Sequence, residues 1–152
     1  MPGPSKDLKE AEGALRLVIE ALIDGQEGFQ GIGDSLKDET LKRYFLAESL
    51  KRAQFRGDLE TILHQDGVKD IKESGTAAGA FVRIWGDLKA IVGGGDHALL
   101  QTAEEAEDKT IEAYSDALEK YLPGPVREVL TEQAAHIRSS HEYVRAARDG
   151  SE

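Results

Sequence analysis

Cysteine is absent from all 152 residues of the chain, and its absence removes several kinds of chemistry. Disulfide bonds, thiolate nucleophiles and cysteine-ligated zinc sites are excluded. The strong metal ligands that remain are four histidines and 29 acidic residues. A metal site in this chain would therefore be built from imidazole and carboxylate groups.

Long apolar runs and blocks of basic residues are missing as well. No segment approaches the roughly 18 apolar residues of a membrane span, and residues 1–13 lack the apolar core of a secretory signal. The 19 lysines and arginines are interspersed with acids and the net charge is −10, so a surface that follows nucleic-acid phosphates is not expected. We therefore expect a cytoplasmic protein that binds neither nucleic acid nor a membrane. The length suits a single helical domain over residues 1–152, with a loose tail at 1–5.

Four segments carry apolar residues at alternating spacings of three and four, the pattern of packed helices. They cover residues 8–32, 41–62, 100–121 and 126–147. A short break at Gly33 and Asp34, with Ser35 restarting the pattern, predicts that the second helix returns antiparallel to the first. The turn Pro123–Gly124–Pro125 does the same for the last two helices. Asp96 is expected to cap the third helix.

Residues 67–96 connect the second and third helices. Within them, residues 76–92 predict a shorter helix that carries Phe81, Ile84 and Trp85. A connection of this length can return along the bundle, so the third helix can run parallel to the second, as in ferritin-like proteins. The predicted fold is all-α: a ferritin-like four-helix bundle with an extra crossover helix between helices 2 and 3. The apolar stripe around Trp85 further predicts a homo-oligomer that forms through the crossover helix.

Two charged residues lie in the middle of the second apolar seam. Glu48 and Arg52 occupy positions where a bundle normally places leucine. They are four residues apart and can pair along one face of the helix. Because buried ions are destabilising unless partners are supplied, the centre of the bundle is predicted to be polar.

Further polar residues are predicted at the same height. Counting outward from the two turns places Glu107 near Ser140 and Tyr114 near Gln133, with His136 at the edge. Arg52 can then fork between Glu48 and Glu107. We predict one buried polar network made of Glu48, Arg52, Glu107, Tyr114 and Gln133.

The alternative hypothesis is a di-iron type carboxylate site. Such a bundle supplies one glutamate from each of two helices and a Glu-x-x-His motif from each of the other two. Here Lys51 and Ala135 stand where the two histidines would lie. The best metal ligands under this hypothesis are Glu48, Glu107 and His136, with Glu104 and Glu132 in reserve. The fixed charge of Arg52 argues against it, because a cation repels a metal ion.

The remaining polar residues form no catalytic motif. The sequence has no nucleophile elbow, phosphate-binding loop or Ser/His/Asp arrangement. No catalytic or cofactor-binding residue is assigned, and no cofactor is expected beyond the iron or other divalent metal of the alternative hypothesis. Glu20, Asp24 and Glu27 lie off the apolar seam of the first helix, and the sequence leaves open where they point.

Several of these residues also carry a family resemblance. The positions are Asp24-Gly25, Gly28-Phe29, Glu48, Arg52, Ser74-Gly75, Gly79, Arg83, Trp85, Glu107 and Tyr114. Through them the chain resembles a bacterial family of four-helix-bundle proteins, a domain of unknown function placed in the ferritin-like superfamily. The resemblance implies the ferritin-like fold and brings no activity. We therefore predict a non-enzymatic ferritin-like bundle with a structural, stress-related or partner-binding role; the alternative is a divalent-metal carboxylate oxidase or iron-binding protein.

Overall fold

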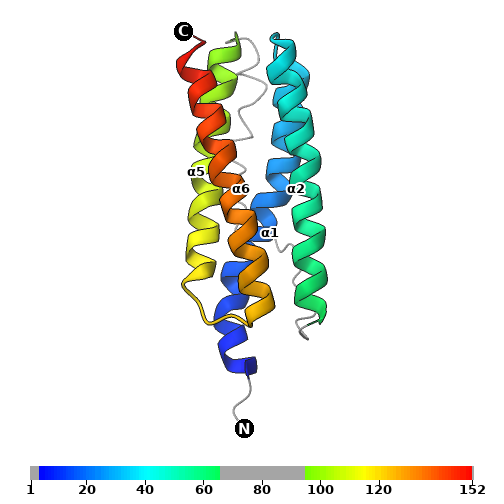
Figure 1. Cartoon of the computed structure of the whole chain (residues 1–152), viewed down its shortest axis with the longest axis vertical. Coiled ribbons are helices and arrows are strands. Elements are labelled where there is room, and N and C mark those ends of the chain that lie inside the picture. The colour runs from blue at the N-terminus through cyan, green and yellow to red at the C-terminus, as the bar shows by residue number, and fades with distance from the viewer. Residues whose placement is uncertain (1–3, 66–94, 152) are drawn as a thin grey trace.

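The computed structural model of the protein describes residues 4–65 and 95–151, which form four α-helices. They are α1 (Pro4–Ser35), α2 (Glu39–Gln65), α5 (Gly95–Leu118) and α6 (Gly124–Asp149). The helices pack side by side along the long axis of the molecule (Figure 1). The predicted all-α bundle of four helices is confirmed, and the described residues contain no strand.

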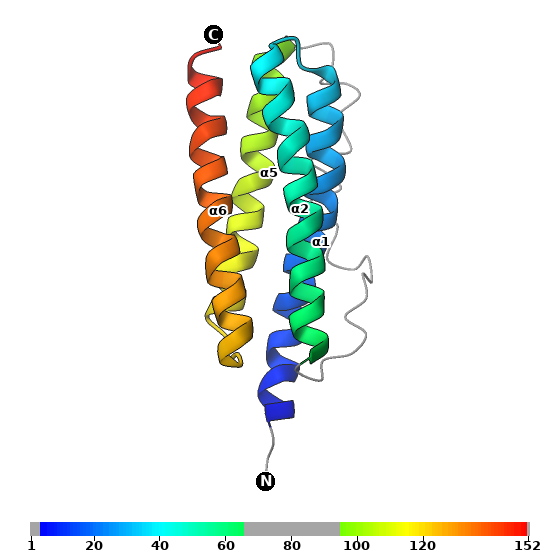
Figure 2. The same ribbon diagram turned by 45° about the vertical axis from the view of Figure 1, so that its right-hand side comes forward.

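The helices run in two antiparallel pairs. α1 returns as α2 and α5 returns as α6, while α2 and α5 both run downward from the same end (Figures 1 and 2). α1 packs on α2 and α5, and α6 packs on α5 and α2, so α2 and α5 occupy opposite corners. The parallel course expected for α2 and α5 is therefore present. The predicted crossover helix at 76–92, with Trp85, lies outside the described residues.

The turn between α1 and α2 differs from its prediction. Ser35 does not start the second helix; it ends α1, where its hydroxyl donates a hydrogen bond to the carbonyl of Gly31 at 3.0 Å. Asp38 takes the capping role instead, because its Oδ1 accepts the amide of Leu41 at 2.9 Å. Helix α1 continues through Gly33, where the absence of a side chain allows α2 to approach closely: a Cβ at Gly33 would lie 2.9 Å from Cδ2 of Leu46.

Asp96 also has a different role from the cap predicted for its own helix. Helix α5 already begins at Gly95, whose φ of 83° suits glycine. The Asp96 carboxylate accepts the amides of Lys37 at 2.9 Å and of Asp38 at 3.1 Å. The start of α5 is thus tied to the turn between α1 and α2. At the other end of the chain α1 begins at Pro4, so the last two residues of the expected tail are helical.

The core consists of two apolar clusters. The cluster nearer the start of α1 is built from all four helices and includes Leu15, Leu22, Leu59, Leu130 and Ile137. The cluster nearer the α1–α2 turn includes Phe29, Ile32, Phe45, Leu99 and Val144. The buried polar residues of α2, α5 and α6 that belong to neither cluster include Glu48, Arg52, Glu107 and Ser140.

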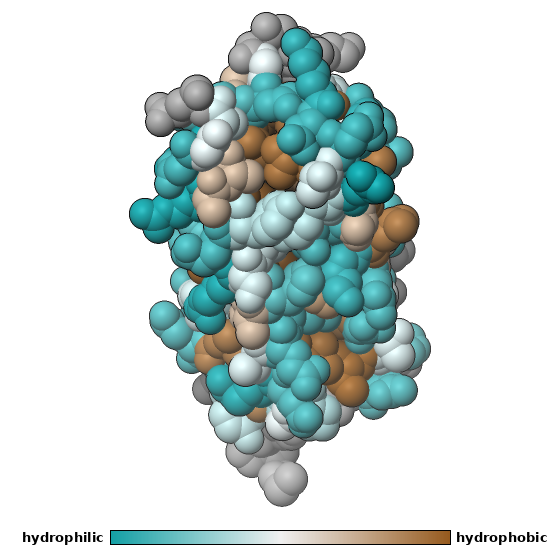
Figure 3. Space-filling model, turned by 45° about the horizontal axis from the view of Figure 1, so that its top comes forward, coloured by the Kyte–Doolittle hydropathy of each residue, from teal (hydrophilic) through white to brown (hydrophobic). Residues whose placement is uncertain are grey.

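The face of the molecule seen in Figure 3 is mainly hydrophilic. Figure 3 shows one face, where hydrophobic residues appear only in small separate patches. Leu50, Tyr121 and Tyr143 are the large apolar residues that the described part of the chain exposes. Within residues 4–65 and 95–151, no helix is both long and apolar enough to cross a bilayer.

Candidate functional site

The guanidinium group of Arg52 is the centre of a buried ionic network. Its Nη2 lies 2.7 Å from Oε2 of Glu107, 3.2 Å from Oε1 of Glu48 and 3.1 Å from Oγ of Ser140. Arg52 and Glu107 are each 1% exposed and Glu48 is 6% exposed. Because these partners come from α2, α5 and α6, one cation joins three helices. The contact with Glu107 is the shortest, as expected for a charge-assisted hydrogen bond.

His136 links the network to the molecular surface. Its Nε2 lies 2.9 Å from Oε2 and 3.0 Å from Oε1 of Glu48. When Glu48 is ionised, its oxygens can only accept hydrogen bonds, and Nε2 of His136 is then the donor in this pair. The His136 side chain is 32% exposed, and its ring meets Phe55 edge-on at 5.2 Å between centroids. His136 is therefore the solvent-facing end of a chain that leads through Glu48 to Arg52.

Helix α1 contributes an aromatic face rather than a charge. The Cζ of Arg52 lies 4.4 Å from the centre of the Phe29 ring, within the range of a cation–π interaction. Gly25 lies beside the same side chain: a Cβ there would be 3.9 Å from Cγ, Cδ and Nη1 of Arg52. That separation is an ordinary contact, so glycine is not strictly required at this position. All four described helices thus meet at Arg52.

Tyr114 and Gln133 form a second, separate polar pair. The Tyr114 hydroxyl donates to Oε1 of Gln133 at 2.8 Å, and Nε2 of Gln133 donates to the carbonyl of Phe55 at 2.9 Å. Both side chains are buried. The single layer expected from the sequence therefore divides into two sets. Tyr114 is seven residues beyond Glu107, about 10 Å along the helix axis at 1.5 Å per residue.

Burial and hydrogen bonding set the proton affinities in the network. Burial raises the pKa of the Glu107 carboxyl, and the charge of Arg52 and its hydrogen bond oppose that effect. Burial also raises the pKa of Tyr44 to about 12, against a hydrogen bond with Ser140. Two buried atoms, Nε of Arg52 and Oε1 of Glu107, have no hydrogen-bond partner among the described residues. The network is therefore buried, but not all of its hydrogen-bonding atoms have a partner among the described residues.

Arg52 lies between the two carboxylates that were the best candidate metal ligands. Glu48 and Glu107 share a cation already, because Arg52 contacts both. Glu104 is engaged by Arg148, and Glu132 is exposed. In the part of the chain that the structure describes, no three histidine, aspartate or glutamate side chains are arranged to hold a metal ion. A metal at Glu48 and Glu107 would have to displace a permanently charged guanidinium.

The contacts also leave no serine–histidine pair within the network. Ser140 accepts from Arg52, while His136 bonds Glu48. His141, five residues further along α6, turns to the opposite neighbour and places Nε2 at 2.8 Å from Oδ1 of Asp108. The two histidines therefore tie α6 to α2 on one side and to α5 on the other.

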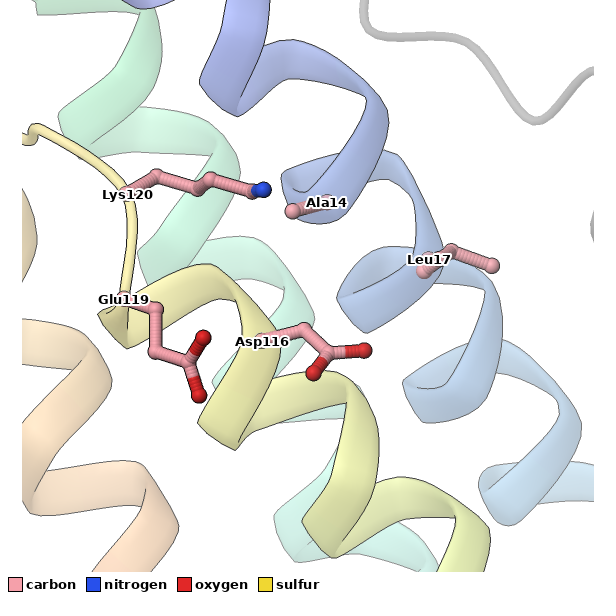
Figure 4. A pocket seen from close by; sticks show the side chains of 5 residues that line it. All are labelled: Ala14, Leu17, Asp116, Glu119 and Lys120. Carbon is pink, nitrogen blue, oxygen red and sulfur yellow. The ribbon is translucent and has the colours of Figure 1, made fainter.

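Two pockets among the described residues lie away from this network. One, of about 270 Å³, is formed by Ala14 and Leu17 of α1 with Asp116, Glu119 and Lys120 at the end of α5 (Figure 4). In this pocket the Lys120 side chain extends toward Ala14 (Figure 4). Another, of about 520 Å³, lies at the opposite end and includes Asp38, Asp96 and Ser151. Neither pocket includes a residue of the Arg52 network.

The three carboxylates of α1 differ in environment. Glu20 is buried, Asp24 is partly buried and Glu27 is exposed. Oδ2 of Asp24 is buried and has no hydrogen-bond partner among the residues described. Burial, followed by the charges of Glu27 and Glu20, raises the pKa of Asp24 to about 6. These carboxylates are absent from the contacts of Arg52.

We expect Asp24→Asn to stabilise the protein at neutral pH. Folding raises the pKa of the Asp24 carboxyl from 3.8 to about 6. The folded protein therefore loses stability as pH rises through this range, because the folded state holds the proton more tightly than the unfolded state. Asparagine does not ionise and so avoids that loss. The expected gain in the free energy of unfolding is no more than about 1 kcal/mol, because the site is partly solvated. Thermal melts across this pH range should show a flatter profile for the variant than for Asp58→Asn, an exposed control on α2. Identical pH profiles for Asp24→Asn and the wild type would contradict the assignment.

Sequence reasoning missed two partners of the network. Tyr44 is four residues before Glu48, a spacing that places both on one helix face, but the hydrogen bond to Ser140 depends on α6. Phe29 lies within the apolar pattern of residues 8–32, but that pattern does not predict its contact with Arg52. Gly25, Phe29 and Arg52 are all among the positions that carry the family resemblance. Their shared presence there is the one feature of the sequence that points to this contact.

These features define a class: an all-α bundle of four described helices, held at its centre by a buried salt-bridge network. The particular family follows from sequence. Residues 10–120, well over half of the chain, match the family model DUF2383, a domain of unknown function, and the chain belongs to that family. No curated protein matches the chain.

Proposed function

We propose that this protein is a non-enzymatic, ferritin-like bundle with a structural or partner-binding role, in which the Arg52 network joins helices instead of performing a reaction. The observation that carries this proposal is the position of Arg52, whose Nη2 contacts both Glu48 and Glu107. In a di-iron bundle the corresponding carboxylates face metal ions. A guanidinium is charged at every physiological pH and cannot leave by losing a proton.

The contacts of the network support a joining role. Glu48 lies on the same helix as Arg52, whereas Glu107 lies on α5 and Ser140 on α6, so the network constrains α5 and α6 relative to α2. The Ser140 hydroxyl and the His136 ring, which are the groups that could act on a substrate, are both engaged in this network. A catalytic site would instead leave such groups facing a pocket.

Metal analysis of the purified protein, followed by an iron-dependent oxygen-uptake assay, tests the proposal. We expect no stoichiometric iron and no oxygen uptake above that of Glu107→Ala. Glu105→Ala, which removes an exposed carboxylate from the same helix, is the matched control. Stoichiometric iron that is retained by Glu105→Ala and lost in Glu107→Ala would replace the proposal with an iron oxidase or iron-binding protein.

A further inference from the structure

The charges of the buried network do not balance. Glu48 and Glu107 contribute two carboxylates and Arg52 contributes one cation, and all three are buried. With both carboxylates ionised the cluster carries one excess negative charge. An uncompensated charge in a protein interior is strongly unfavourable and is usually removed by a proton.

The neighbours of this cluster offer a limited choice of site for that proton. Around Glu107, helix α2 contributes Arg52, Glu48 and Tyr44. Helix α6 contributes Ser140 and the charge of His141, which also acts on Glu107. α1 contributes the uncharged ring of Phe29 against Arg52.

Two groups can hold the proton. Glu107 has one oxygen, Oε2, on Arg52 and a second, Oε1, that is buried without a partner among the described residues. The other group is His136, which spans both oxygens of Glu48 and has part of its ring in solvent. Burial raises the pKa of Glu107, which acts in the same direction as the charge count.

We propose that the network is a reversible proton-binding site: one proton from solvent, entering at His136 and held by His136, Glu48 or Glu107, neutralises the cluster and keeps α6 closed on α2 and α5. The inference rests on the joining role proposed above and adds its regulation by pH. The step is an addition of one proton to an imidazole nitrogen or a carboxylate oxygen, without another reactant. Loss of the proton at higher pH leaves two carboxylates facing one arginine and weakens the hold on α6. The contacts of Arg52 with both carboxylates and of His136 with Glu48 link the three groups, so one added proton is shared by the cluster.

NMR titration of the whole wild-type chain tests this directly. Side-chain carboxyl ¹³C signals of Glu48 and Glu107 and ring ¹⁵N signals of His136 report the protonation state of each group. At pH 7 we expect one extra proton, as a protonated carboxyl or as an imidazolium. Two ionised carboxylates with a neutral imidazole at pH 7 would overturn the proposal, and this result does not depend on any variant folding.

Glu107→Gln supplies a second measurement, because the amide mimics a permanently neutral carboxyl. Wild-type melting temperature should fall as pH rises above 4.5, the ordinary pKa of the Glu107 carboxyl, since a group with a raised pKa stabilises the fold below that value. The fall should be reduced in Glu107→Gln and retained in Glu105→Gln. Equal falls in all three proteins would count against the proton site while leaving the metal and oxygen-uptake results, and thus the joining role, intact.

Discussion

Arg52→Ala is expected to lower the free energy of unfolding by about 3 to 5 kcal/mol at neutral pH, the range for removing one partner of a buried ion pair. The change removes the cation that Glu48 and Glu107 share and leaves two buried carboxylates close together. Chemical denaturation of the variant and of Arg56→Ala measures the difference. Arg56 pairs with Glu60 four residues along the same helix at about one-third exposure, so its loss should amount to less than about 1 kcal/mol.

The loss in Arg52→Ala should depend on pH. Arg52 is the main group that opposes the rise in the pKa of Glu107, so its removal raises that pKa further. A carboxyl with a raised pKa stabilises the fold at low pH and loses this contribution as pH rises above 4.5. The variant should therefore be damaged most at neutral pH and less in mild acid. A loss below about 1 kcal/mol that does not change with pH would mean that Arg52 is not in the core.

Removing all three charges provides the control for this interpretation. The triple variant Glu48→Leu, Arg52→Met and Glu107→Leu removes every ion of the network, and apolar side chains of similar volume often replace such ions without loss. Most of the stability lost in Arg52→Ala should then return. Continued severe destabilisation of the triple variant would point to poor packing of the helices at this height, independent of charge.

Phe29→Ala is expected to have an effect of similar size for a different reason. Phe29 is 1% exposed, lies 4.9 Å from the Phe45 ring between centroids, and covers the guanidinium of Arg52. Truncating a buried phenylalanine to alanine leaves a cavity and typically costs about 3 to 5 kcal/mol. Denaturant unfolding of Phe29→Ala measures this loss. Tyr121→Ala, at a position that is 65% exposed, should change stability by no more than about 0.5 kcal/mol.

The aromatic contact with Arg52 can be separated from the cavity. Phe29→Leu keeps most of the apolar volume and removes the ring face. A double-mutant cycle with Arg52→Met should then give a coupling of about 0.5 to 2 kcal/mol, the range of a cation–π pair. Additive effects in this cycle would show that Phe29 stabilises the core only through packing.

The buried positions of Glu48 and Arg52 could be predicted because helix periodicity converts sequence spacing into a face. Their place among the apolar residues of α2 needed no knowledge of the other helices. The heights of Glu107 and Ser140 followed from counting outward along antiparallel helices, and the structure brings both to Arg52. The same counting placed Tyr114 with Gln133, but it did not resolve that this pair stands apart from Arg52.

Features that depend on distant residues could not be read from local sequence. Ser35 and Asp38 are both reasonable helix caps, and local sequence does not show that α1 runs past Gly33, where α2 packs closely through Leu46. Asp96 accepts amides that are 58 and 59 residues away. The sequence also did not determine whether His136 contacts α2 or α5, because a residue at the edge of a helix face can reach either neighbouring helix.

The three-helix contact of Arg52 also affects which alternative bundles the sequence can form. Sliding α6 by one turn, about 5.4 Å, would separate Arg52 from Ser140 and Glu48 from His136. A misaligned bundle would therefore keep the three buried ions but lose the hydroxyl and imidazole contacts that complete them, which widens the energy gap between the native register and its competitors. We infer that the ions specify alignment more than they add stability. The neutral triple variant should then match the wild type in stability, yet show broader amide NMR lines from helices that exchange between registers.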